Sequence, residues 1–579
     1  MLFAVLSVFA VMAIAVACGG DDDPATTPAA TVASGGTAGA TTAGTTAPVV
    51  TAPKGTITIQ ALQFETWDPH FSDFAQDIAH FFMVWRGLYE FDLESKPIPS
   101  MADAAPAVSA DGKTYTVKLK KDLKWSDGTA IKASDFVAGL QRTCDFANAG
   151  HYQYIMTAVV GCDAAYDAKN KDKTAAEIDT LRKAVGVKAI DDLTVEYKLT
   201  DAQPTFSILL AMWPTFPIAA SKVKDIYDPK GWPGPLENAY NGPFMPKAYT
   251  EKASLELVPN PNWSGKQKAQ VERIVLRYID DNAVSNNAYR SGELDAVAAN
   301  SSELDKLKTE FKFGASGAEL YLYPATRTIG LQMQHKDPTL ANPDVRIALS
   351  RATDRATMMK IVFKDGNTAT TSWVPPARNG LKGGEYDSLI GFDVTAAKAS
   401  LAKAGFANGA GFPKLILLQT DTATNKLLGD FLQAEWRKHL GIDITLEYTD
   451  SKSRSAKYNA KDFQLLIGGW QEDYPDPENW FFGLYETGGS LNKQNVSIKE
   501  LDEVLAKAKF NRNDEERRKQ FRDAEKLLLQ QASAIAPFWH TQAKFLVKPY
   551  IKGMVESKRP GDTFVPGDWN PENWSTTKK

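Results

Sequence analysis

Residues 466–482, with the sequence LIGGWQEDYPDPENWFF, combine the residue types of a binding site. Two glycines end an apolar, strand-like run, and the consecutive acids Glu472 and Asp473 follow Trp470 and Gln471. A carboxylate enclosed by aromatic rings needs a cationic partner, because an isolated buried charge is strongly unfavourable. The segment therefore predicts a site for a positively charged ligand group. The alternative is a surface turn, in which Glu472 is the better solvated of the two acids.

Sequence motifs of common enzyme and metal sites are absent from the chain. There is no GxSxG, HExxH or Walker motif. The six histidines are scattered, and no two have metal-ligand spacing on one helix. We therefore expect no metal, no cofactor and no enzymatic activity, although two carboxylates across a cleft would also suit a glycosidase. The histidines are His70, His80, His151, His335, His439 and His540.

The first 17 residues are apolar and end in small residues directly before Cys18. This pattern is typical of a cleaved signal peptide whose following cysteine carries lipid. An ordinary signal peptide or an uncleaved anchor is the alternative. The segment 18–53 is rich in Gly, Thr, Ala and Pro and cannot bury enough apolar surface to fold. We expect a disordered tether there, a folded body from residue 55, and a lipid-anchored, extracytoplasmic protein.

The folded body has the composition of a large globular protein. Its length suits several domains or one large two-lobed unit. The net charge is −4 and neither sign forms long blocks, which argues against binding to nucleic acid. Besides Cys18 the chain has only Cys144 and Cys162, and this pair favours a disulfide in an oxidising compartment.

Hydrophobic periodicity predicts alternating strands and helices throughout the body. The segment 344–363 is predicted to be one amphipathic helix, and its charged residues Asp344, Arg346, Asp354 and Arg355 are interpreted as caps and structural ion pairs. Strands are expected at 55–62, within 113–120, at 191–201, within 241–263, at 411–420 and at 441–450. Further helices are expected within 67–92, after a cap at Ser134 or Asp135, at 422–440, and after the capping-box patterns at 497–500 and 513–516.

Five motifs occur in the order found in one family. They are SADGKTYTVKLKKDLKWSDGTAIKASDFVAGLQR, NGPFMPKAYTEKASLELVPNPNW, YRSGELDAV, NPDVRIALSRATDRATMMKIV and GGWQEDYPDPENWFF, and together they span most of residues 55–555. The chain thereby resembles the extracytoplasmic solute-binding proteins of the peptide/nickel ABC-importer family (family 5, cluster C). The form of the EDYPDP and NGPF segments most resembles the oligopeptide-binding branch.

The resemblance implies an α/β, bilobal periplasmic-binding-protein fold of type II, in its large cluster C form with a two-strand hinge. Lobe I would comprise 55–325 plus 542–579, with an extra subdomain at about 93–200, and lobe II would comprise 326–541. The hinge strands would cross near Pro324–Thr328 and His540–Ala543. A monomer is expected, which binds a peptide and delivers it to the transmembrane subunits of an ABC permease.

The resemblance also implies which residues contact the ligand. Asp473 matches the acid that pairs with the ligand's α-ammonium, and main-chain groups near it would hold an extended peptide by strand addition. The expected ligand-binding residues are Asp473, Trp470, Gly469, Gln471, Tyr152, Phe74, Ala75, Trp373 and Asn300.

Several of these assignments have alternatives. Trp470 and Trp373 also suit a packed core, Tyr152 suits an ordinary surface position, and Phe74 and Ala75 rest on the resemblance alone. The chain departs from the family at residues 465–468, where an arginine that can reach a ligand carboxylate is replaced by an apolar residue.

That departure keeps other ligands open. An oligosaccharide, stacked on tryptophans such as Trp213, Trp373, Trp470 and Trp480, is the alternative within the same transporter family. A metal chelate is a further one, and a receptor or chaperone-like role without transport is another.

Overall fold

The structure is a computed structural model in which residues 53–72, 74–92, 95–364, 366–380, 384–530, 534–555 and 570–578 are described. The expected signal peptide at 1–17, the lipidated Cys18 and the tether up to residue 52 lie outside the described residues. None of the helices in the described part is both long and apolar enough to cross a membrane.

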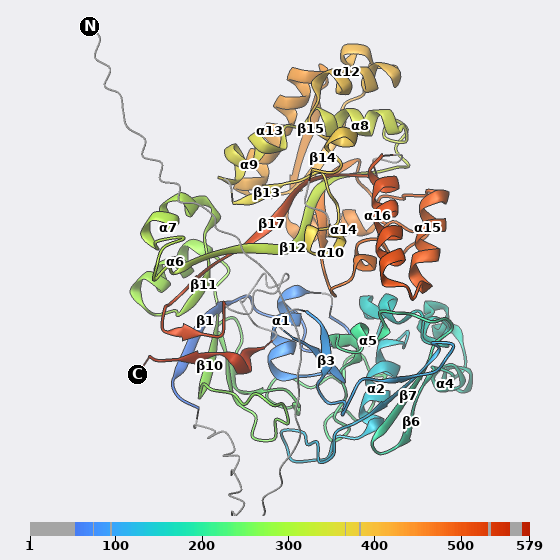
Figure 1. The fold of residues 1–579 in the computed structure, drawn as a ribbon, viewed down its shortest axis with the longest axis vertical. Coiled ribbons are helices and arrows are strands. Elements are labelled where there is room, and N and C mark those ends of the chain that lie inside the picture. Colours follow the sequence, from blue (N-terminus) through green and yellow to red (C-terminus); the bar gives the residue numbers. More distant parts are fainter. Residues whose placement is uncertain are drawn as a thin grey trace, which may run out of the picture. The chain divides into compact units, whose positions relative to one another are not determined.

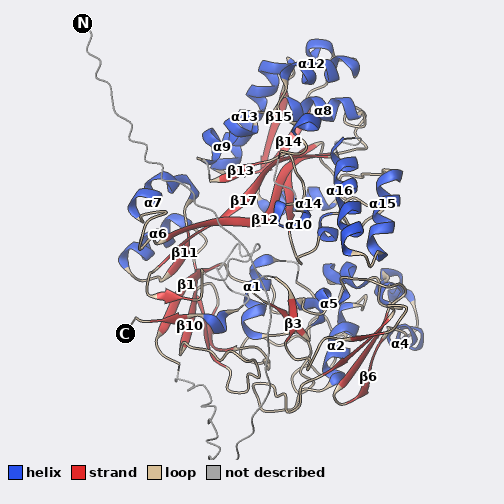
Figure 2. Ribbon diagram, viewed as in Figure 1, coloured by secondary structure: helices blue, strands red, loops and turns tan. Residues whose placement is uncertain are grey.

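One mixed sheet of 11 strands runs through the described residues (Figures 1 and 2). Its two longest strands, β12 and β17, pair antiparallel in the middle of the sheet and link its two ends. The order is β15-β14-β16-β12-β17-β11-β1-β10-β9-β8, with β13 beside β17. The strands are β1 (Thr56–Ala61), β8 (Phe244–Thr250), β9 (Ser254–Pro259), β10 (Arg273–Tyr278), β11 (Ala296–Ala298), β12 (Leu320–Met333), β13 (Asn367–Ala369), β14 (Leu415–Thr420), β15 (Ile444–Thr449), β16 (Leu465–Gln471) and β17 (Ile535–Val547).

Separate hydrophobic cores form on either side of the β12–β17 pair. On β12, Ala325 belongs to the core of the N-terminal half, whereas Ile329 belongs to that of residues 329–539. On β17 the same change occurs between Trp539 and Ala543. The change of core falls at the expected strand crossings, and the exact lobe boundaries stay a prediction.

A second sheet of four strands, in the order β4-β5-β7-β6, lies within residues 107–198 (Figure 2). Cys144, which caps the C-terminal end of α2, and Cys162, the first residue of α3, are joined by a disulfide in this region. The elements of this part are β4 (Ala107–Val108), β5 (Thr114–Lys118), α2 (Ala133–Thr143), η1 (His151–Met156), α3 (Cys162–Tyr166), η2 (Ala168–Asp172), α4 (Ala175–Lys183), β6 (Val187–Asp191) and β7 (Thr194–Lys198).

The predicted helix over 344–363 is wrong, because the chain breaks it into α8 (Pro343–Arg351) and α9 (Arg355–Phe363). Asp354 caps the second helix by accepting a hydrogen bond from the Thr357 N–H. Arg355 donates to the Pro537 carbonyl, so these charges have structural roles, as expected.

Three local predictions need correction. The predicted strand within 241–263 is a hairpin of two strands, β8 and β9. Helix α2 begins after Lys132, so Asp135 is not the residue before the helix but lies in its first turn, where its side chain accepts from the Lys132 N–H as in a capping box. The helix after 497–500 begins after Ile498, without a side-chain cap, because the apolar residue and not Ser497 precedes its first turn.

The remaining elements surround these sheets (Figure 1). They are α1 (Ala75–Val84), β2 (Tyr89–Phe91), β3 (Pro97–Pro99), α5 (Phe206–Leu209), η3 (Trp213–Thr215), α6 (Asn282–Ser291), η4 (Ser301–Glu303), α7 (Leu304–Glu310), α10 (Pro376–Asn379), α11 (Asp387–Ile390), α12 (Val394–Lys403), η5 (Ala407–Gly409), α13 (Ala423–Leu440), α14 (Ser451–Asn459), η6 (Pro477–Trp480), α15 (Lys499–Phe510), α16 (Asp514–Gln530), β18 (Ile551–Lys552), η7 (Pro571–Asn573) and β19 (Ser575–Thr576).

The first and last described segments lie side by side. A Cβ added to Gly55 would meet the Thr576 side chain at 2.8 Å and the Lys578 carbonyl at 3.2 Å. The Lys578 ammonium is 2.8 Å from the buried carboxylate of Asp295, which follows α6. The chain therefore enters and leaves its folded part at neighbouring positions.

Candidate functional site

Strand β16 has one edge that no other described strand covers along most of its length. It pairs with β12 from Leu465 to Gln471, but with β14 only at Leu465 and Leu466. Alternate main-chain groups of residues 467–471 therefore face away from β12 with no strand beside them. We call this stretch the open edge. An extended chain could hydrogen-bond there by strand addition.

The glycine at the centre of the open edge is required by packing. A Cβ on Gly469 would lie 1.8 Å from the Thr328 carbonyl of β12, closer than any side chain allows. The adjacent Gly468 has more room, since the nearest atom is the end of the Leu466 side chain at 2.9 Å. Gly469 thus has a structural reason to be glycine, in addition to its expected place beside the ligand.

Asp473 lies just beyond the open edge and accepts hydrogen bonds from neutral groups. Tyr152 donates to one carboxylate oxygen at 2.6 Å, and Tyr154 donates to the other at 2.9 Å. The Asn479 amide also donates to the second oxygen, at 3.1 Å. The two tyrosines come from η1, so this acid links the N-terminal half of the chain to the end of β16.

The Asn479 side chain holds this arrangement in place. Its carbonyl oxygen accepts from the Asp473 N–H at 2.9 Å and from the Trp470 indole at 3.0 Å. Asn479 is itself buried, on the short helix η6. Trp470 therefore has a polar anchor, while part of its ring packs against the core of the C-terminal half.

Burial raises the pKa of Asp473 to about 6, because desolvation disfavours the charged form. The hydrogen bonds from Tyr152, Asn479 and Tyr154 oppose this shift without cancelling it. A carboxylate has about four acceptor positions, and three donors occupy this one. The arrangement can accept one further donor, and a cationic one would lower the pKa again.

Glu472, interpreted from the sequence as the better solvated acid, is in fact buried. Its side chain is 3% exposed and accepts from the Arg378 guanidinium at 2.5 Å. Desolvation raises the pKa of Glu472 to about 7, and the charge of Arg378 opposes the shift. No local pattern predicts this pair, because Arg378 is 94 residues away in the sequence, on α10.

The next acids along the chain form a closed network. Arg517 of α16 donates twice to Asp476 at 2.8 Å and once to Glu478 at 2.7 Å. Glu478 also accepts from the Thr205 hydroxyl at 2.6 Å, a second contact with the N-terminal half. Paired in this way, these two acids position the segment that carries Asp473.

The residues expected on the N-terminal side lie close to Asp473's tyrosines. The ring centroids of Tyr152 and Trp213 are 4.6 Å apart, and the Trp213 indole donates to the Ser72 carbonyl at 3.3 Å. Phe74 follows Ser72 with an exposed side chain and an extended backbone, directly before Ala75 at the start of α1. Trp213 thus connects the segment before α1 to Tyr152.

Two expected ligand residues have structural roles in this structure. Trp373 does not line a cleft: its side chain is buried, and its indole donates to the Trp480 carbonyl at 2.8 Å. The core that Trp373 completes is made of α16 and the segment after β16, which sequence patterns cannot bring together. Asn300 caps η4 by accepting from the Ser302 N–H.

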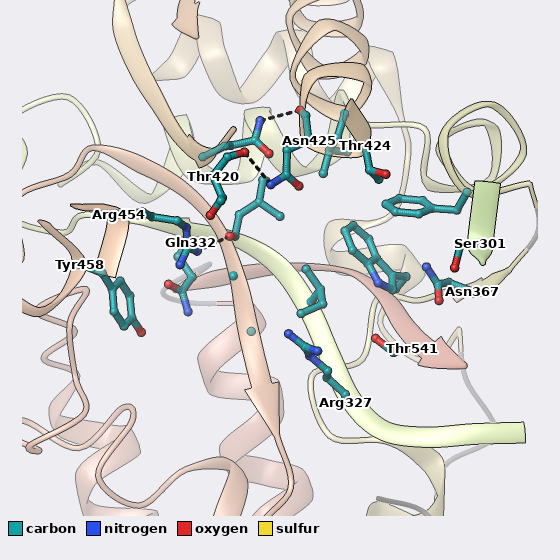
Figure 3. Close-up of a pocket in the computed structure, with 18 of the residues that line it drawn as sticks. Ser301, Arg327, Gln332, Asn367, Thr420, Thr424, Asn425, Arg454, Tyr458 and Thr541 are labelled. Carbon is teal, nitrogen blue, oxygen red and sulfur yellow. Dashed lines mark hydrogen bonds between the residues drawn. The ribbon is translucent and has the colours of Figure 1, made fainter. Parts of the chain in front are cut away.

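A pocket of about 560 Å³ lies beside the open edge (Figure 3). Gly468 and Gly469 line it together with Arg327 of β12, Arg454 of α14 and Lys544 of β17. Among the described residues that line it there is no aspartate or glutamate. The sequence analysis missed these three cations, and the available signal was a lone charge within each apolar strand, at Arg327 and Lys544.

The Gln471 side chain, at the end of the open edge, has polar atoms that lack a hydrogen-bond partner. Both its amide oxygen and its amide nitrogen are buried without a hydrogen-bond partner in the described part of the structure. Buried polar groups are normally paired, so such a side chain suits contact with a polar ligand or water.

Across residues 53–72, 74–92, 95–364, 366–380, 384–530, 534–555 and 570–578, no His, Cys, Asp and Glu cluster could hold a metal.

Several known proteins are similar to this chain in sequence or in fold. The dipeptide-binding protein of Lactococcus lactis is 30% identical over 449 residues, 73% of this chain and 77% of that protein. The oligopeptide-binding protein OppA of Bacillus subtilis is 25% identical over 480 residues, 82% of this chain and 85% of that protein. The solved structure of the Escherichia coli murein tripeptide-binding protein MppA has a TM-score of 0.75 at 23% identity, covering 91% of this chain and 99% of that one.

The similarity to solved binding proteins confirms the predicted bilobal α/β fold. A model of the bacterial extracellular solute-binding proteins, family 5 Middle, matches residues 96–492. The chain therefore belongs to family 5 of the bacterial extracellular solute-binding proteins, as its five motifs predicted.

Proposed function

We propose that this protein captures oligopeptides outside the cytoplasm and delivers them to the transmembrane subunits of an ABC importer. The peptide would lie extended along the open edge of β16, and its α-ammonium group would pair with Asp473. The observation that carries the proposal is the contrast at residues 472–473: Glu472 has its own arginine, whereas the donors to Asp473 among the described residues are all neutral. A free α-ammonium supplies the missing positive charge.

Main-chain recognition explains why such a site would accept many sequences. Hydrogen bonds to the open edge read no side chains, and Gly468 and Gly469 leave the edge uncovered. The relatives include a dipeptide-binding and an oligopeptide-binding protein, which agrees with a peptide ligand. No catalytic role, no nucleic-acid partner and a monomeric state belong to the same proposal.

The N-terminal features complete the proposed cellular role. The apolar residues 1–17 would act as a signal peptide, and lipid on Cys18 would anchor the protein to a membrane through the tether at 18–53. Anchoring keeps the binding protein close to its permease, which raises the effective concentration of the two partners.

The oligosaccharide alternative has weaker support. Sugars stack on exposed tryptophan faces, but Trp213, Trp373 and Trp480 are each at most 1% exposed. Trp470 alone of the four is partly accessible, and its indole N–H already bonds to Asn479. A sugar would also leave the Asp473 carboxylate without a cation.

Identification of the ligand that copurifies with the protein tests the proposal directly. We expect mild denaturation of the purified protein to release a mixture of short peptides, detected by mass spectrometry. A series of hexose masses, or a single metal chelate, would contradict the peptide assignment. The protein refolded after denaturation, and therefore empty, serves as the control for peptides that bind nonspecifically.

A further inference from the structure

We propose that the Cys144–Cys162 disulfide positions the two tyrosines that hold Asp473, and thereby sets how strongly the site selects a free α-ammonium group. The disulfide would act through the loop that it closes, without contacting the ligand. The inference rests on the proposed function only for the ligand of Asp473. It assigns a role in binding to a bond that lies outside the open edge.

The disulfide closes the loop that carries both tyrosines. Cys144 follows the last turn of α2, and Cys162 begins α3, 18 residues later. Tyr152 and Tyr154 lie between them, on the short helix η1. Both cysteines are fully buried, so the crosslink belongs to the interior of the protein. Because a crosslink limits the conformations of the loop that it closes, it constrains the segment that holds the tyrosines.

Gln153, which separates the two tyrosines, contacts the far end of the loop. Its amide donates to the Asp163 carboxylate at 2.7 Å, and its nitrogen is 3.5 Å from the Cys162 sulfur. The Gln153 side chain is buried, whereas the hydroxyls of its two neighbours donate to Asp473. Helix η1 thus contacts both the disulfide and, through its tyrosines, the acid beyond β16.

The first part of the loop is also attached to the segment that Cys162 begins. The Phe146 N–H donates to the Ala165 carbonyl at 3.2 Å, and the Tyr166 hydroxyl donates to the Gly150 carbonyl at 3.0 Å. The position of η1 therefore depends on where α3 lies.

The segment that begins at Cys162 has little hydrophobic core of its own. Across residues 162–183, the buried residues are Cys162, Ala165 and Asn170, and none belongs to α4. Segments with few buried apolar contacts open locally at a low cost in free energy. The disulfide therefore fixes a part of the chain that packing alone holds weakly.

Helix α2 gives the disulfide a rigid support. Arg142 contacts the buried carboxylate of Asp68 at 2.5 Å, and the Thr143 hydroxyl donates to the Pro214 carbonyl at 2.6 Å. Cys144 comes next in the chain. The disulfide thus joins α3 to a helix end that is already fixed in the N-terminal half.

Loss of this attachment should change the charge of Asp473. The bonds from Tyr152 and Tyr154 stabilise the ionised carboxylate, so a displaced η1 would raise the pKa of Asp473 further above its present value of about 6. Only the Asn479 amide, among the described donors to this carboxylate, would then remain. Less of the acid would be ionised at a given pH, and its attraction for an α-ammonium group would weaken.

The double variant Cys144→Ser with Cys162→Ser tests the proposal without leaving a free thiol in the loop. Calorimetry of the full-length protein, after removal of copurified ligand, compares alanine peptides of three to six residues with a free and with an acetylated amine. We expect affinity for the free-amine form to fall about 3- to 30-fold, as for loss of one or two hydrogen bonds to a charged group. Affinity for the acetylated form should change little, and the midpoint of the pH profile should move upward.

Val195→Ala is the matched control for a general loss of stability. Val195 is fully buried on β7, in the sheet of four strands, but it lies outside the loop. This variant should lower the melting temperature without changing the ratio of the affinities for free and acetylated peptides. A fall in that ratio as large as that of the double variant would reject the positioning role.

Gln153→Leu tests the same path with the disulfide intact. It removes the bond to Asp163 and should cause a smaller loss of free-amine affinity in the same direction. It also replaces the double variant if that variant does not fold. An unchanged affinity and pH midpoint in Gln153→Leu would show that η1 does not depend on this contact and would count against the proposal.

Hydrogen exchange of the empty protein tests the positioning without a ligand. Amides of residues 145–161 should exchange faster in the double variant, measured by mass spectrometry, while those of β12 and β17 keep the rates of the parent. Unchanged exchange at 150–156 would overturn the proposal, because η1 would then be held in place without the disulfide.

The outcomes separate this proposal from the proposed function. An unchanged ratio of free to acetylated affinity in the double variant would overturn the positioning role and leave peptide binding intact. An equal loss for both peptide forms would also reject it, because the disulfide would then stabilise the protein without acting on Asp473. Binding of no peptide by the parent would overturn the proposed function, and the exchange rates of the empty protein would then decide whether the disulfide positions η1.

Discussion

Two buried carboxylates are adjacent in the sequence at the end of β16, yet they face different regions of the molecule. Glu472 faces α10, where Arg378 supplies a full positive charge at 2.5 Å. Asp473 faces η1, where Tyr152 and Tyr154 supply only neutral hydroxyl groups. Burial raises both pKa values, to about 7 for Glu472 and to about 6 for Asp473.

The difference shows how a protein can keep one acid available for a ligand. A buried acid with its own arginine is internally compensated and stabilises the fold only as part of that pair. A buried acid held by neutral donors is positioned but not neutralised, so an incoming cation gains the full interaction. The tyrosines also come from the other half of the chain, which ties the charge of Asp473 to contact between the two halves.

The largest effect should come from removing the charge of Asp473. Asp473→Asn keeps the shape and can still accept hydrogen bonds, but it should weaken binding of free-amine peptides by about 2–5 kcal/mol. Calorimetry with a peptide and its N-acetylated form measures the effect. The acetylated peptide should bind the parent and the variant equally; equal loss for both forms would mean that Asp473 does not contact the α-ammonium.

The second largest effect should be the dependence of stability and of peptide affinity on pH. Desolvation raises the pKa of Asp473 to about 6, above its unfolded value near 4, so the empty folded state holds an extra proton in this interval. The contribution of Asp473 to the folding stability of the empty protein should therefore fall as pH rises from 4 to 6. Peptide affinity should rise over the same interval, because the ammonium binds the ionised acid, by up to about 100-fold.

Binding isotherms between pH 4 and pH 7.5 measure this dependence. Asp473→Asn should flatten most of the slope, and any slope that remains belongs to Glu472 and other groups that titrate nearby. A parent affinity that is constant across this range would show that the charge of Asp473 does not contribute to binding.

Glu472→Gln should lower stability and leave peptide affinity nearly unchanged, whereas Asp473→Asn should mainly lower affinity. Loss of the charge leaves Arg378 without its buried counterion, which should lower the free energy of unfolding by about 2 kcal/mol. Peptide affinity should change little, because Glu472 does not face the ligand. Chemical denaturation and calorimetry on the same preparation give both quantities; a larger effect on affinity than on stability would reverse the assigned roles.

The smallest effect should come from a single tyrosine hydroxyl. Tyr154→Phe removes one of three donors to Asp473, and peptide affinity should fall by about 1 kcal/mol, roughly fivefold. The bond lowers the pKa of Asp473, so its loss should also move the midpoint of the pH profile upward. Tyr249→Phe, on β8, is a control, because among the described residues Tyr249 does not contact this acid. An unchanged midpoint would show that Tyr154 does not bond to Asp473 in solution.

Sequence patterns predicted the local elements best where one element supplies its own signal. The alternating strands at 55–62 and 441–450 and the helix at 422–440 appear close to their predicted limits. The split of 344–363 into two helices was missed, because apolar periodicity continues across the break and Asp354 begins the second helix without interrupting it.

The site could be predicted only in part. Family motifs predict both Asp473 and Tyr152 as site residues, and the Tyr152 hydroxyl is 2.6 Å from the Asp473 carboxylate. The partners that give each acid its character, Arg378, Tyr154 and Asn479, are identified only by the fold, because contacts between distant segments leave no local pattern. Trp373 shows the converse, since a tryptophan in a Pro-rich segment suits a cleft as well as a core.

The neighbouring positions of Gly55 and Lys578 have a practical consequence for experiments on this protein. A fluorophore or surface linker attached near Lys578 would report from the same place where the chain from residues 1–52 joins the fold. Chains whose ends lie together also tolerate circular permutation. A permuted protein with a short linker between residues 578 and 53 would therefore have its new ends elsewhere. Distance sensors could then be attached to β12 and β17 without disturbing the open edge.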